Sequence, residues 1–437
     1  MLNIGTRKQL FIDDRFIESA RGMHHCMNPP IQFPEMLLTN DQPWEAQGIG
    51  AYNTVLRENG RFRMWYDAGL KGGLPAEGAR RLCYAESDDG LSWRKPTLGL
   101  LPFRGSKENN IVAPLLERQS LQGGSILIDE RLPESERYRL WTKFLPTNEE
   151  RENGASPGLW AMYSSDGIHW NYYEDQPNRA ARACDTQNVF FWDDRIEEYV
   201  GYTRVAETQH SGEAAERSQN LNKRGEGRYR SIGRITSPDF MSWSELEIVF
   251  EADAEDLALP VPSHNDDPRP NLDIYTNCAQ KYSLAQDVYL MFPSFYYHWG
   301  EDEYPATMDV QMLTSRDGIS WQRAGGRHPF LRQGFDGTAT SGMVFANPWL
   351  IPMGDELWMF YSGTSRHHGA GKSAETFSSG IFRAVMRLDG FVSLDADANG
   401  GTVETVPLRI PDGRLEVNVD ATQGSLAVEV LFPDGRI

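Results

Sequence analysis

The sequence is poor in three features that mark common protein classes: cysteine, basic charge and long apolar runs. The 437 residues include only 4 cysteines. Because these show neither paired spacing nor a metal-ligand pattern with histidine, we expect reduced thiols, no metal and no cofactor. Lysine and arginine total 43 against 62 acidic residues, a formal net charge of −19. This balance argues against nucleic acid or an anionic membrane as the partner, since both require basic patches.

Two further absences bear on location and fold. No apolar run approaches the length of a membrane span, and the first eight residues, Met1 to Lys8, lack the apolar core of a signal peptide. We therefore expect a soluble protein, cytoplasmic as the sequence stands, or periplasmic or secreted if a signal peptide has been removed. No long window keeps a helical period, so we expect far less helix than the usual third. The oligomeric state stays open.

What the sequence does contain is a short phrase that returns at a nearly fixed interval. Its copies are SDDGLSW at 87–93, SSDGIHW at 164–170, SPDFMSW at 237–243, SRDGISW at 315–321 and a worn RLDGF at 387–391. The central aspartates are 77, 73, 78 and 72 residues apart. Such a period marks a repeat architecture. Asp-Gly between apolar runs predicts a tight hairpin, because glycine adopts positive φ and the aspartate bonds nearby backbone amides.

Two strand-like segments precede each phrase. Aromatic, roughly alternating runs occupy 61–67, 137–143, 198–204, 287–292 and 356–361, and shorter apolar runs before them occupy 53–57, 125–129, 188–192, 275–282 and 343–350. Alternation of this kind is typical of half-buried strands. Four strands in each unit of roughly 75 residues, repeated five times, predict an all-β, five-bladed β-propeller with four-stranded antiparallel blades.

The repeats also divide the chain. Residues 1–50 form an N-terminal segment that we expect to supply the strand closing the ring, and residues 51–396 form the propeller. In residues 397–437 the pattern shifts to two alternating stretches, 414–420 and 425–431, which predict strands of a partial β-sandwich or a packed extension.

The innermost strands of a propeller converge on one axis, so polar residues near their starts should share a central pocket. These candidates are Glu45, Tyr52, Asn53, Asn109, Asn110, Asp185, Gln187, Asn188, His264, Asp273 and Tyr275. Arg204 ends its strand nearby, and Trp44 and Trp299 are candidates to stack on a sugar face. Carboxylates from several blades stand out, because two carboxyl groups across a glycosidic bond are the minimal machinery for sugar hydrolysis.

The five repeats, the Ser-x-Asp-Gly-x-x-Trp hairpins and the strand start Asp185–Phe190 resemble the clan of propeller glycosidases that includes glycoside hydrolase families 32, 43 and 68. Leu10–Asp14 and Pro43–Glu45 are similar to uncharacterised bacterial proteins often described as family-32-like. The resemblance covers roughly residues 8 to 395. It implies that Asp185 matches the aspartate of the clan's middle blades, which stabilises the transition state. Where the clan has an aspartate opening blade one, this chain has Tyr52 and Asn53, and no Glu-Gly-Pro or Glu-Cys-Pro phrase follows in blade four.

These observations predict a glycoside hydrolase acting on an oligo- or polysaccharide. Asp185, Asp273 and Glu45 are its expected acid, base and stabilising residues, in roles not apportioned among them. The expected substrate-binding residues are Trp44, Tyr52, Asn53, Asn109, Asn110, Gln187, Asn188, Arg204, His264, Tyr275 and Trp299. The alternatives are a non-catalytic carbohydrate-binding propeller and a glycoside phosphorylase, which would need arginine and histidine beside the acid. Structurally, Asp185 could cap a turn, Asp273 could follow its proline-rich loop, and Glu45 could form an ion pair.

Overall fold

The computed structural model describes residues 1–46, 48–69, 80–113, 123–144, 158–173, 186–205, 230–257, 272–297, 306–368, 377–410 and 414–431. These residues are almost entirely β-structure, and α3 (Ala254–Leu257) is the one α-helix among them. The expectation of little helix is therefore confirmed for this part of the chain. None of its helices has the length and apolar character needed to cross a membrane.

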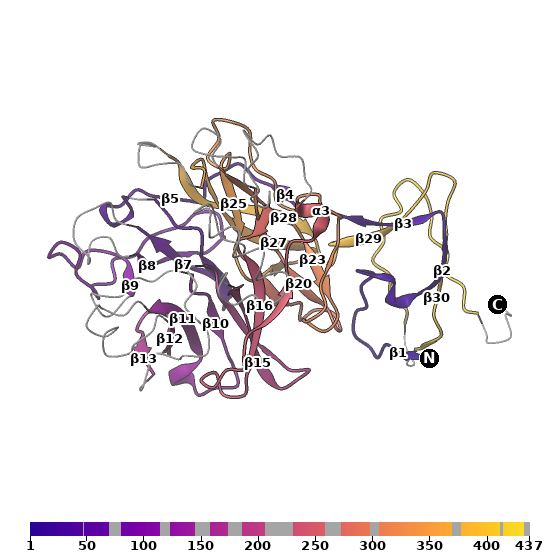
Figure 1. Cartoon of the computed structure of the whole chain (residues 1–437), viewed down its shortest axis with the longest axis horizontal. Helices are drawn as coiled ribbons and strands as arrows, with labels where there is room; N and C mark the ends of the chain where they lie inside the picture. Colours follow the sequence, from indigo (N-terminus) through magenta and orange to yellow (C-terminus); the bar gives the residue numbers. More distant parts are fainter. Residues whose placement is uncertain are drawn as a thin grey trace.

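Four antiparallel sheets of four strands each carry the first four repeats (Figure 1). The first sheet contains β6 (Thr54–Glu58), β7 (Arg61–Ala68), β8 (Arg81–Ser87) and β9 (Ile111–Ala113). The second contains β10 (Ile126–Ile128), β11 (Tyr138–Phe144), β12 (Gly158–Ser164) and β13 (Asn171–Tyr172). The third contains β14 (Val189–Asp193), β15 (Glu198–Val205), β16 (Ser231–Ser237) and β17 (Glu247–Phe250). The fourth contains β19 (Ala279–Lys281), β20 (Tyr289–Met291), β23 (Leu313–Ser315) and β24 (Gln322–Arg323).

The strands of the fifth repeat belong to a larger, nine-stranded sheet. It contains β18 (Leu272–Ile274), β21 (Ser294–Tyr297), β22 (Thr307–Val310), β25 (Met343–Ala346), β26 (Ile351–Met353), β27 (Glu356–Thr364), β28 (Ser379–Arg387), β4 (Ile31–Gln32) and β5 (Leu38–Thr39). The predicted propeller with four-stranded blades is thus confirmed for four sheets, whereas a fifth separate four-stranded blade is not found among the described residues.

The nine-stranded sheet has a local cause. Pro293 separates β20 from β21 and has no N–H to donate, so the second strand of the fourth repeat is interrupted. Irregular hydrogen bonds cross the break, from Phe292 N to Asn277 O and from Gln311 N to Pro293 O, each 3.1 Å. The outer pieces β21 and β22 then reach β25 through one parallel register pair, Met308 with Met343.

The repeated phrase forms the hairpin that its residues predict. Oδ1 of Asp89 accepts hydrogen bonds of 2.7 Å from both Leu91 N and Ser92 N, and these amides hold the pKa of Asp89 at about 2. Gly90 has a φ of +75°. In the third copy Phe240 replaces the glycine and still adopts a φ of +71°. Its ring is buried against Trp141, so packing offsets a backbone cost of about 1–2 kcal/mol.

The hairpins also set a common strand register. In four repeats the first inward aromatic of the second strand pairs with the hairpin serine: Phe62 with Ser87, Tyr138 with Ser164, Tyr199 with Ser237 and Tyr289 with Ser315. Except in the third copy, the same serine accepts the amide of the hairpin glycine, as Ser87 Oγ does from Gly90 N at 2.9 Å. One hairpin motif therefore fixes both the turn and the alignment of the two strands it joins.

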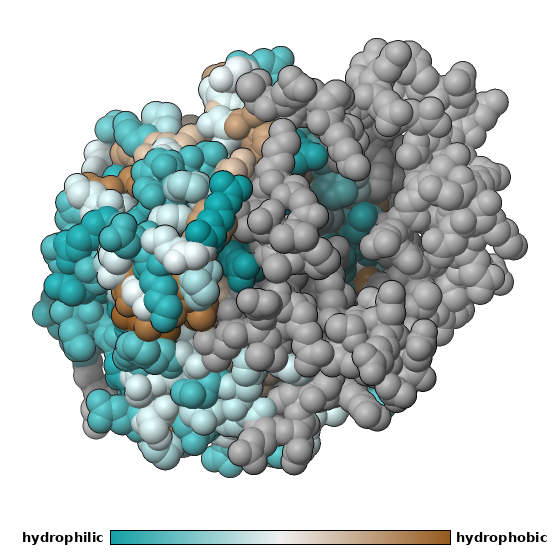
Figure 2. All heavy atoms as spheres, turned by 90° about the vertical axis from the view of Figure 1, so that its left-hand side faces the viewer, coloured by the Kyte–Doolittle hydropathy of each residue, from teal (hydrophilic) through white to brown (hydrophobic). Residues whose placement is uncertain are grey.

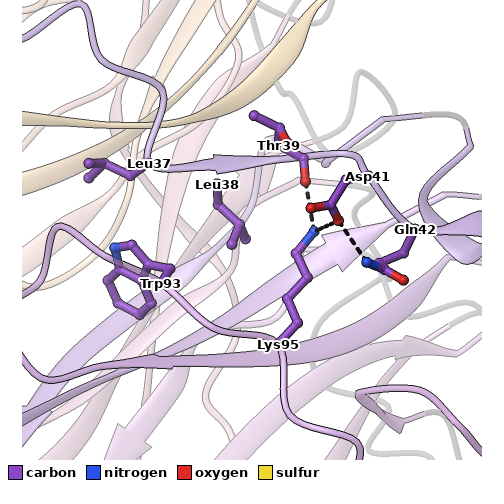
Figure 3. A pocket seen from close by; sticks show the side chains of 7 residues that line it. All are labelled: Leu37, Leu38, Thr39, Asp41, Gln42, Trp93 and Lys95. Carbon is purple, nitrogen blue, oxygen red and sulfur yellow. Dashed lines mark hydrogen bonds and ion pairs between the residues drawn. The ribbon is translucent and has the colours of Figure 1, made fainter.

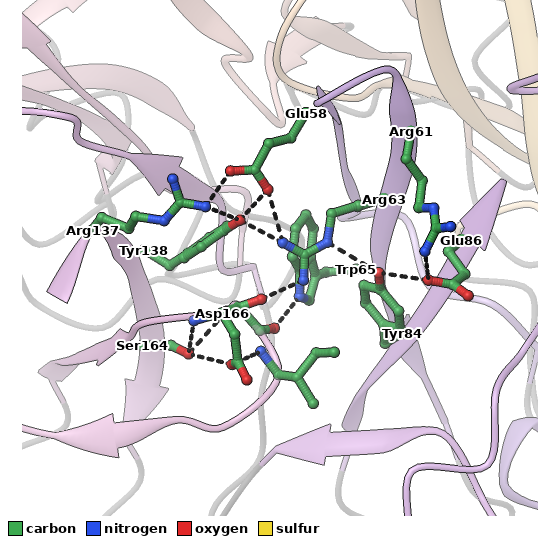
Figure 4. A network of polar contacts seen from close by, with 12 residues as sticks. Glu58, Arg61, Arg63, Trp65, Tyr84, Glu86, Arg137, Tyr138, Ser164 and Asp166 are labelled. Carbon is green, nitrogen blue, oxygen red and sulfur yellow. Dashed lines mark hydrogen bonds and ion pairs between the residues drawn. The ribbon is translucent and has the colours of Figure 1, made fainter. Parts of the chain in front are cut away.

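Hairpins rest on the second strand of the preceding sheet. Trp65 Nε1 of β7 donates to Gly167 O at 2.6 Å, and Tyr202 OH of β15 donates to Gly318 O at 2.6 Å. Figure 4 shows the first of these joints, where Arg63 bonds Glu58, Tyr84, Tyr138 and the carbonyl of Asp166. Because these donors are buried, each such joint between sheets has one preferred geometry.

A tyrosine and a carboxylate join neighbouring sheets at three of these joints. Tyr138 donates to Glu58, Tyr199 to Asp129, and Tyr289 to Asp193, in the last case at 2.6 Å. At the joint between last and first repeats the contact is aromatic instead, with Phe62 and Trp358 stacked at 5.8 Å between centroids. There β4 and β5 pair with β28, so the N-terminal segment adds strands to the last repeat.

The remaining terminal segments pair with each other on the right of Figure 1. β1 (Leu2–Asn3) pairs with β31 (Leu408–Arg409), β2 (Ile17–Arg21) with β30 (Thr402–Thr405), and β3 (Met23–Met27) with β29 (Val392–Ala396). The strands predicted at 414–420 and 425–431 are not formed. Their alternating apolar side chains are exposed, Val430 by 66%, because no partner strand hydrogen-bonds them among the described residues.

Replacing Gly167 by alanine should destabilise the protein by about 2–4 kcal/mol. Gly167 has a φ of +73°, and an added Cβ would lie 2.6 Å from Trp65 Cζ2. Gly60→Ala is the matched control, because Gly60 has a φ of +82° with nothing within 4 Å of its Cβ position. It should cost only the backbone strain, about 1–2 kcal/mol. Equal losses of unfolding free energy in the two variants, measured with denaturant, would show that the close contact of Gly167 with Trp65 contributes nothing.

Candidate functional site

Amide side chains at the starts of the inner strands join the sheets around the axis. Asn53 Nδ2 donates to Ser362 Oγ at 2.7 Å, Asn277 Nδ2 to Gln187 O at 2.8 Å, and Gln187 Nε2 to Ala346 O at 3.1 Å. Asn188 binds Gly123 O in the same way. All are buried. The predicted ligand-binding residues Asn53, Gln187 and Asn188 therefore lie at the axis but hold neighbouring sheets together.

Charged and aromatic side chains gather beside this ring of amides. We call them the arginine–tyrosine cluster: Arg204, Arg230, Asp273, Tyr275, Tyr296 and His368. Their positions are the end of β15, the residue before β16, β18 and the residue after it, β21, and the segment after β27. The cluster contains two of the predicted substrate-binding residues, Arg204 and Tyr275, and the predicted catalytic residue Asp273.

Asp273 is fully buried and is held by an arginine. Its Oδ2 accepts a 2.7 Å hydrogen bond from Arg230 Nη1. The Arg230 guanidinium lies 5.1 Å from the ring centroids of both Tyr275 and Tyr296. Arg204 lies 5.2 Å from the Tyr275 centroid. Two guanidinium groups thus share one tyrosine ring, which stabilises positive charge through its π face.

His368 lies between the two tyrosines. Its Nε2 is 3.1 Å from Tyr275 OH, and its Nδ1 is 2.9 Å from Tyr296 OH. In neutral imidazole one nitrogen donates and the other accepts, so the two hydroxyl groups take opposite roles. A tyrosine–histidine–tyrosine chain of this kind positions a proton donor and an acceptor beside the arginines.

The first sheet reaches the cluster through aromatic contacts. Tyr52, another predicted binding residue, packs edge-to-face on Phe345 at 6.2 Å, and Phe345 lies 6.2 Å from Tyr275. Tyr52 is 4% exposed. It therefore packs against the cluster through Phe345.

Asp67 is a second buried carboxyl group at this end of the ring. It lies near the end of β7, is 1% exposed, and burial raises its pKa from 3.8 to about 7, although Arg80 and the Gly123 amide lower it. Arg80 Nη1 lies 3.8 Å from its Oδ2. Hydrogen bonds from the segment 186–188 connect Gly123 with the cluster. Gly123 O accepts from Asn188 N at 2.8 Å, and Thr186 Oγ1 donates to Tyr275 O at 2.8 Å.

Four predicted site residues lie elsewhere, in a buried polar group of the first sheet. Glu45 is 0% exposed and accepts from Lys95 Nζ at 2.8 Å and from Tyr66 OH at 2.6 Å. This environment favours the ion-pair alternative for Glu45. Trp44 is 8% exposed and donates to Asn110 Oδ1 at 2.9 Å, so its indole N–H and ring are enclosed.

Asn109 and Asn110 do not lie at the start of an inner strand, where the sequence analysis expected them. They precede β9, which is the fourth strand of the first sheet and not an inner strand. Asn109 Nδ2 binds Leu101 O at 2.8 Å, and Asn110 Nδ2 binds Tyr66 OH at 2.7 Å. Both amides therefore stabilise the edge of the first sheet.

A shallow depression of about 280 Å³ lies beside this group (Figure 3). Its lining residues are Leu37, Leu38, Thr39, Asp41, Gln42, Trp93 and Lys95. Lys95 Nζ donates to Asp41 Oδ1 and Thr39 O, each at 2.7 Å. The positive charge of Lys95 in the depression is therefore neutralised by Asp41. The described surface on the left-hand side of Figure 1 is mainly hydrophilic (Figure 2), which suits a polar ligand.

Three predicted site residues, Asp185, His264 and Trp299, lie outside the described residues. Sequence reasoning overlooked Asp67, Arg230 and His368. A signal for Asp67 was present: it follows Phe62 by five residues, as Arg204 follows Tyr199. Aligning the second strands of the repeats would have shown a charged residue at this position in the first three repeats, namely Asp67, Lys143 and Arg204.

Comparisons with known proteins bear on the fold. No protein-family model and no curated protein matches the chain. An N-acetylgalactosamine deacetylase from F. plautii, in complex with blood group B trisaccharide, has a TM-score of 0.52 at 15% identity, over 83% of this chain and 95% of its own. A protein described as a glycoside hydrolase gives 0.51 at 15%, over 82% and 92%. BT0996, solved as an RGII complex, gives 0.50 at 16%, over 82% and 92%.

The chain shares its fold with these proteins. At this level of identity the likeness extends to the β-propeller arrangement and not to the chemistry of the site. The resemblance to glycoside hydrolase families 32, 43 and 68 therefore stays a prediction.

The raised pKa of Asp67 predicts a pH-dependent stability. A carboxyl group that is harder to ionise in the folded state lowers stability as pH rises from about 4 to about 7, with no further change above. Asp67→Asn does not titrate, so its unfolding free energy relative to that of the wild type should be higher at pH ~8 than at pH ~5. Denaturant unfolding at both values measures this difference.

Asp309→Asn is a second test of the same reasoning. Asp309 is also buried, and burial raises its pKa to about 7, with Tyr297 opposing. It should flatten the pH dependence in the same way. Asp309 pairs with Phe295 and Asp273 pairs with Tyr296, so the two aspartates lie on opposite faces of one sheet. A wild-type pH profile in Asp67→Asn would contradict the assignment of a raised pKa.

Proposed function

We propose that the protein is a carbohydrate-active enzyme that cleaves a glycosidic bond in an oligo- or polysaccharide. The observation that carries this proposal is the pair of buried aspartates, Asp67 and Asp273, contributed by different sheets at one end of the ring. The fold neighbours add support, because one is described as a glycoside hydrolase and another as an N-acetylgalactosamine deacetylase. A clan relationship with families 32, 43 and 68 belongs to this proposal.

A five-bladed ring is also part of the proposal. Joining β18 with β19, β20 with β21, and β22 with β23 across their short breaks turns the fourth repeat into one blade. β25 to β28, closed by β4 and β5, then form the fifth. The stack of Phe62 on Trp358, between the first and last repeats, supports this closure.

In the proposed mechanism Asp67 is the general acid. A carboxyl group with a pKa of about 7 keeps a proton near neutral pH and can deliver it to the leaving oxygen. Asp273, oriented by Arg230, is the partner that activates water or stabilises the positive charge that develops on the sugar ring. Asp185, next to Thr186, is the proposed third carboxylate. The hydrogen bonds of Glu45 leave it outside this set.

A second candidate function is phosphorolysis. Sequence reasoning required arginine and histidine beside the acid for a phosphorylase. Here Arg204, Arg230 and His368 surround Tyr275 next to Asp273, the carboxylate that partners the proposed acid Asp67. Guanidinium groups bind phosphate strongly because their donors match its oxygens. Inorganic phosphate would then replace water as the attacking group.

Asp67→Asn should lower turnover at least about 100-fold while leaving ligand binding in place, because general acid catalysis contributes on the order of 10²–10⁴. Asp309→Asn should stay within a few-fold of wild type, as it carries the same burial on the other sheet face. A panel of aryl glycosides and oligosaccharides, with the product anomer read by NMR, measures both. Binding without any turnover across the panel, in wild type and variants alike, would favour a carbohydrate-binding module.

Phosphate dependence separates the two catalytic candidates. A phosphorylase should release sugar 1-phosphate only with inorganic phosphate, and Arg204→Gln should raise its KM for phosphate by about tenfold or more. A hydrolase should release free sugar at a rate that phosphate does not raise. Arg195→Gln is a suitable control, because Arg195 bonds Asp317 O and Tyr289 at a joint between sheets.

A further inference from the structure

The paired terminal strands β3 and β29 bring together three different metal-ligating side chains. Their antiparallel register sets His24 opposite Asp395 and Cys26 opposite Ser393. Residues two apart on a strand share a face, and so do residues directly opposite each other. His24, Cys26 and Asp395 therefore project from the same face of this two-stranded ladder.

The distances fit a metal ion. One imidazole nitrogen, the thiol sulfur and one carboxylate oxygen of these residues all lie within 4.8 Å of one another. In a tetrahedral zinc site with metal–ligand bonds of about 2.0–2.3 Å, ligand atoms lie roughly 3.3–3.8 Å apart. Closing the three atoms around an ion thus requires shifts of only about 1 Å, within reach of side-chain rotation.

A second carboxylate adjoins the histidine. Asp397 Oδ1 lies 3.7 Å from His24 Nδ1. It can complete the ligand set or orient the imidazole ring, as a carboxylate hydrogen-bonded to a ligating histidine usually does. His24 and Asp397 are about half exposed, so an ion has a path from solvent.

We propose that His24, Cys26 and Asp395 bind a zinc ion that fastens the N-terminal strand β3 to the C-terminal strand β29. Nitrogen, thiolate and carboxylate ligands together favour zinc over magnesium or calcium, which prefer oxygen alone. Binding breaks the S–H bond of Cys26 and releases its proton to solvent. The site is structural and lies in the paired terminal segments, apart from the arginine–tyrosine cluster.

Spacing along the chain hides this site. His24 and Cys26 are near neighbours, but Asp395 is 369 residues further on than Cys26, so no local motif shows it. Only the pairing of the two termini creates it. The proposal therefore departs from the expectation of no metal, which rested on cysteine and histidine spacing alone.

Cobalt(II) titration of the metal-free 437-residue chain tests the proposal. Cobalt replaces zinc in such sites and gives a near-ultraviolet charge-transfer band when a thiolate binds it. Wild type should show this band, and added zinc should remove it. Cys26→Ser should abolish the band, and His24→Ala and Asp395→Asn should each weaken cobalt binding by about tenfold or more.

His25→Ala is the matched control. His25 pairs with Leu394 and so lies on the opposite face of the ladder, near Asp14. It should bind cobalt as wild type does. Zinc should also raise the melting temperature of wild type and of His25→Ala but not of Cys26→Ser, and matching far-UV circular dichroism without metal shows that the variants fold. No band in wild type, or a band that persists in Cys26→Ser, would overturn the proposal.

Discussion

The structure depends on the contact between each hairpin and the sheet that precedes it. Adjacent blades of a propeller are held mainly by side chains rather than by a continuous hydrogen-bonded ladder, so their relative position must be fixed by specific contacts. Here a buried donor from one sheet binds the hairpin carbonyl of the next, as Trp65 does with Gly167 and Tyr202 with Gly318. In the third copy aromatic packing serves the same purpose: Phe240 occupies the turn itself and packs on Trp141.

This geometry divides the polar residues between two tasks. The starts of the inner strands carry the amides that join sheets across the axis, such as Asn53 and Asn277. Their hydrogen-bonding groups are engaged, so they contribute rigidity rather than chemistry. The charged residues suited to chemistry lie at the ends of the second strands and beside them, where Asp67 and Arg204 occupy equivalent positions in the first and third repeats. A rigid ring thus presents a few buried charges at one end.

The repeats could be predicted from the sequence because the hairpin is local: its serine, aspartate and glycine bond one another within four residues. Asp273, Tyr275 and Arg204 followed from their place at strand ends. For Glu45 the sequence left a catalytic role and an ion pair open, because its partners Lys95 and Tyr66 come from distant segments that only folding brings together. The long connection before β9 concealed that Asn109 and Asn110 end the first repeat. Asp67 was overlooked because it is the last residue of an aromatic run whose pattern is typical of a core strand.

The arginine–tyrosine cluster is positively charged, whereas the whole chain is negatively charged. A net charge of −19 repels anions at long range, but this repulsion is screened beyond about 8–10 Å in physiological salt. Within the cluster, Arg204 and Arg230 both lie over the ring of Tyr275, and Asp273 binds Arg230. Asp273 offsets one of the two positive charges, and burial strengthens the local field of the other, because there is little water to screen it. A field of this kind favours a ligand that brings negative charge to the cluster, such as a phosphate ion.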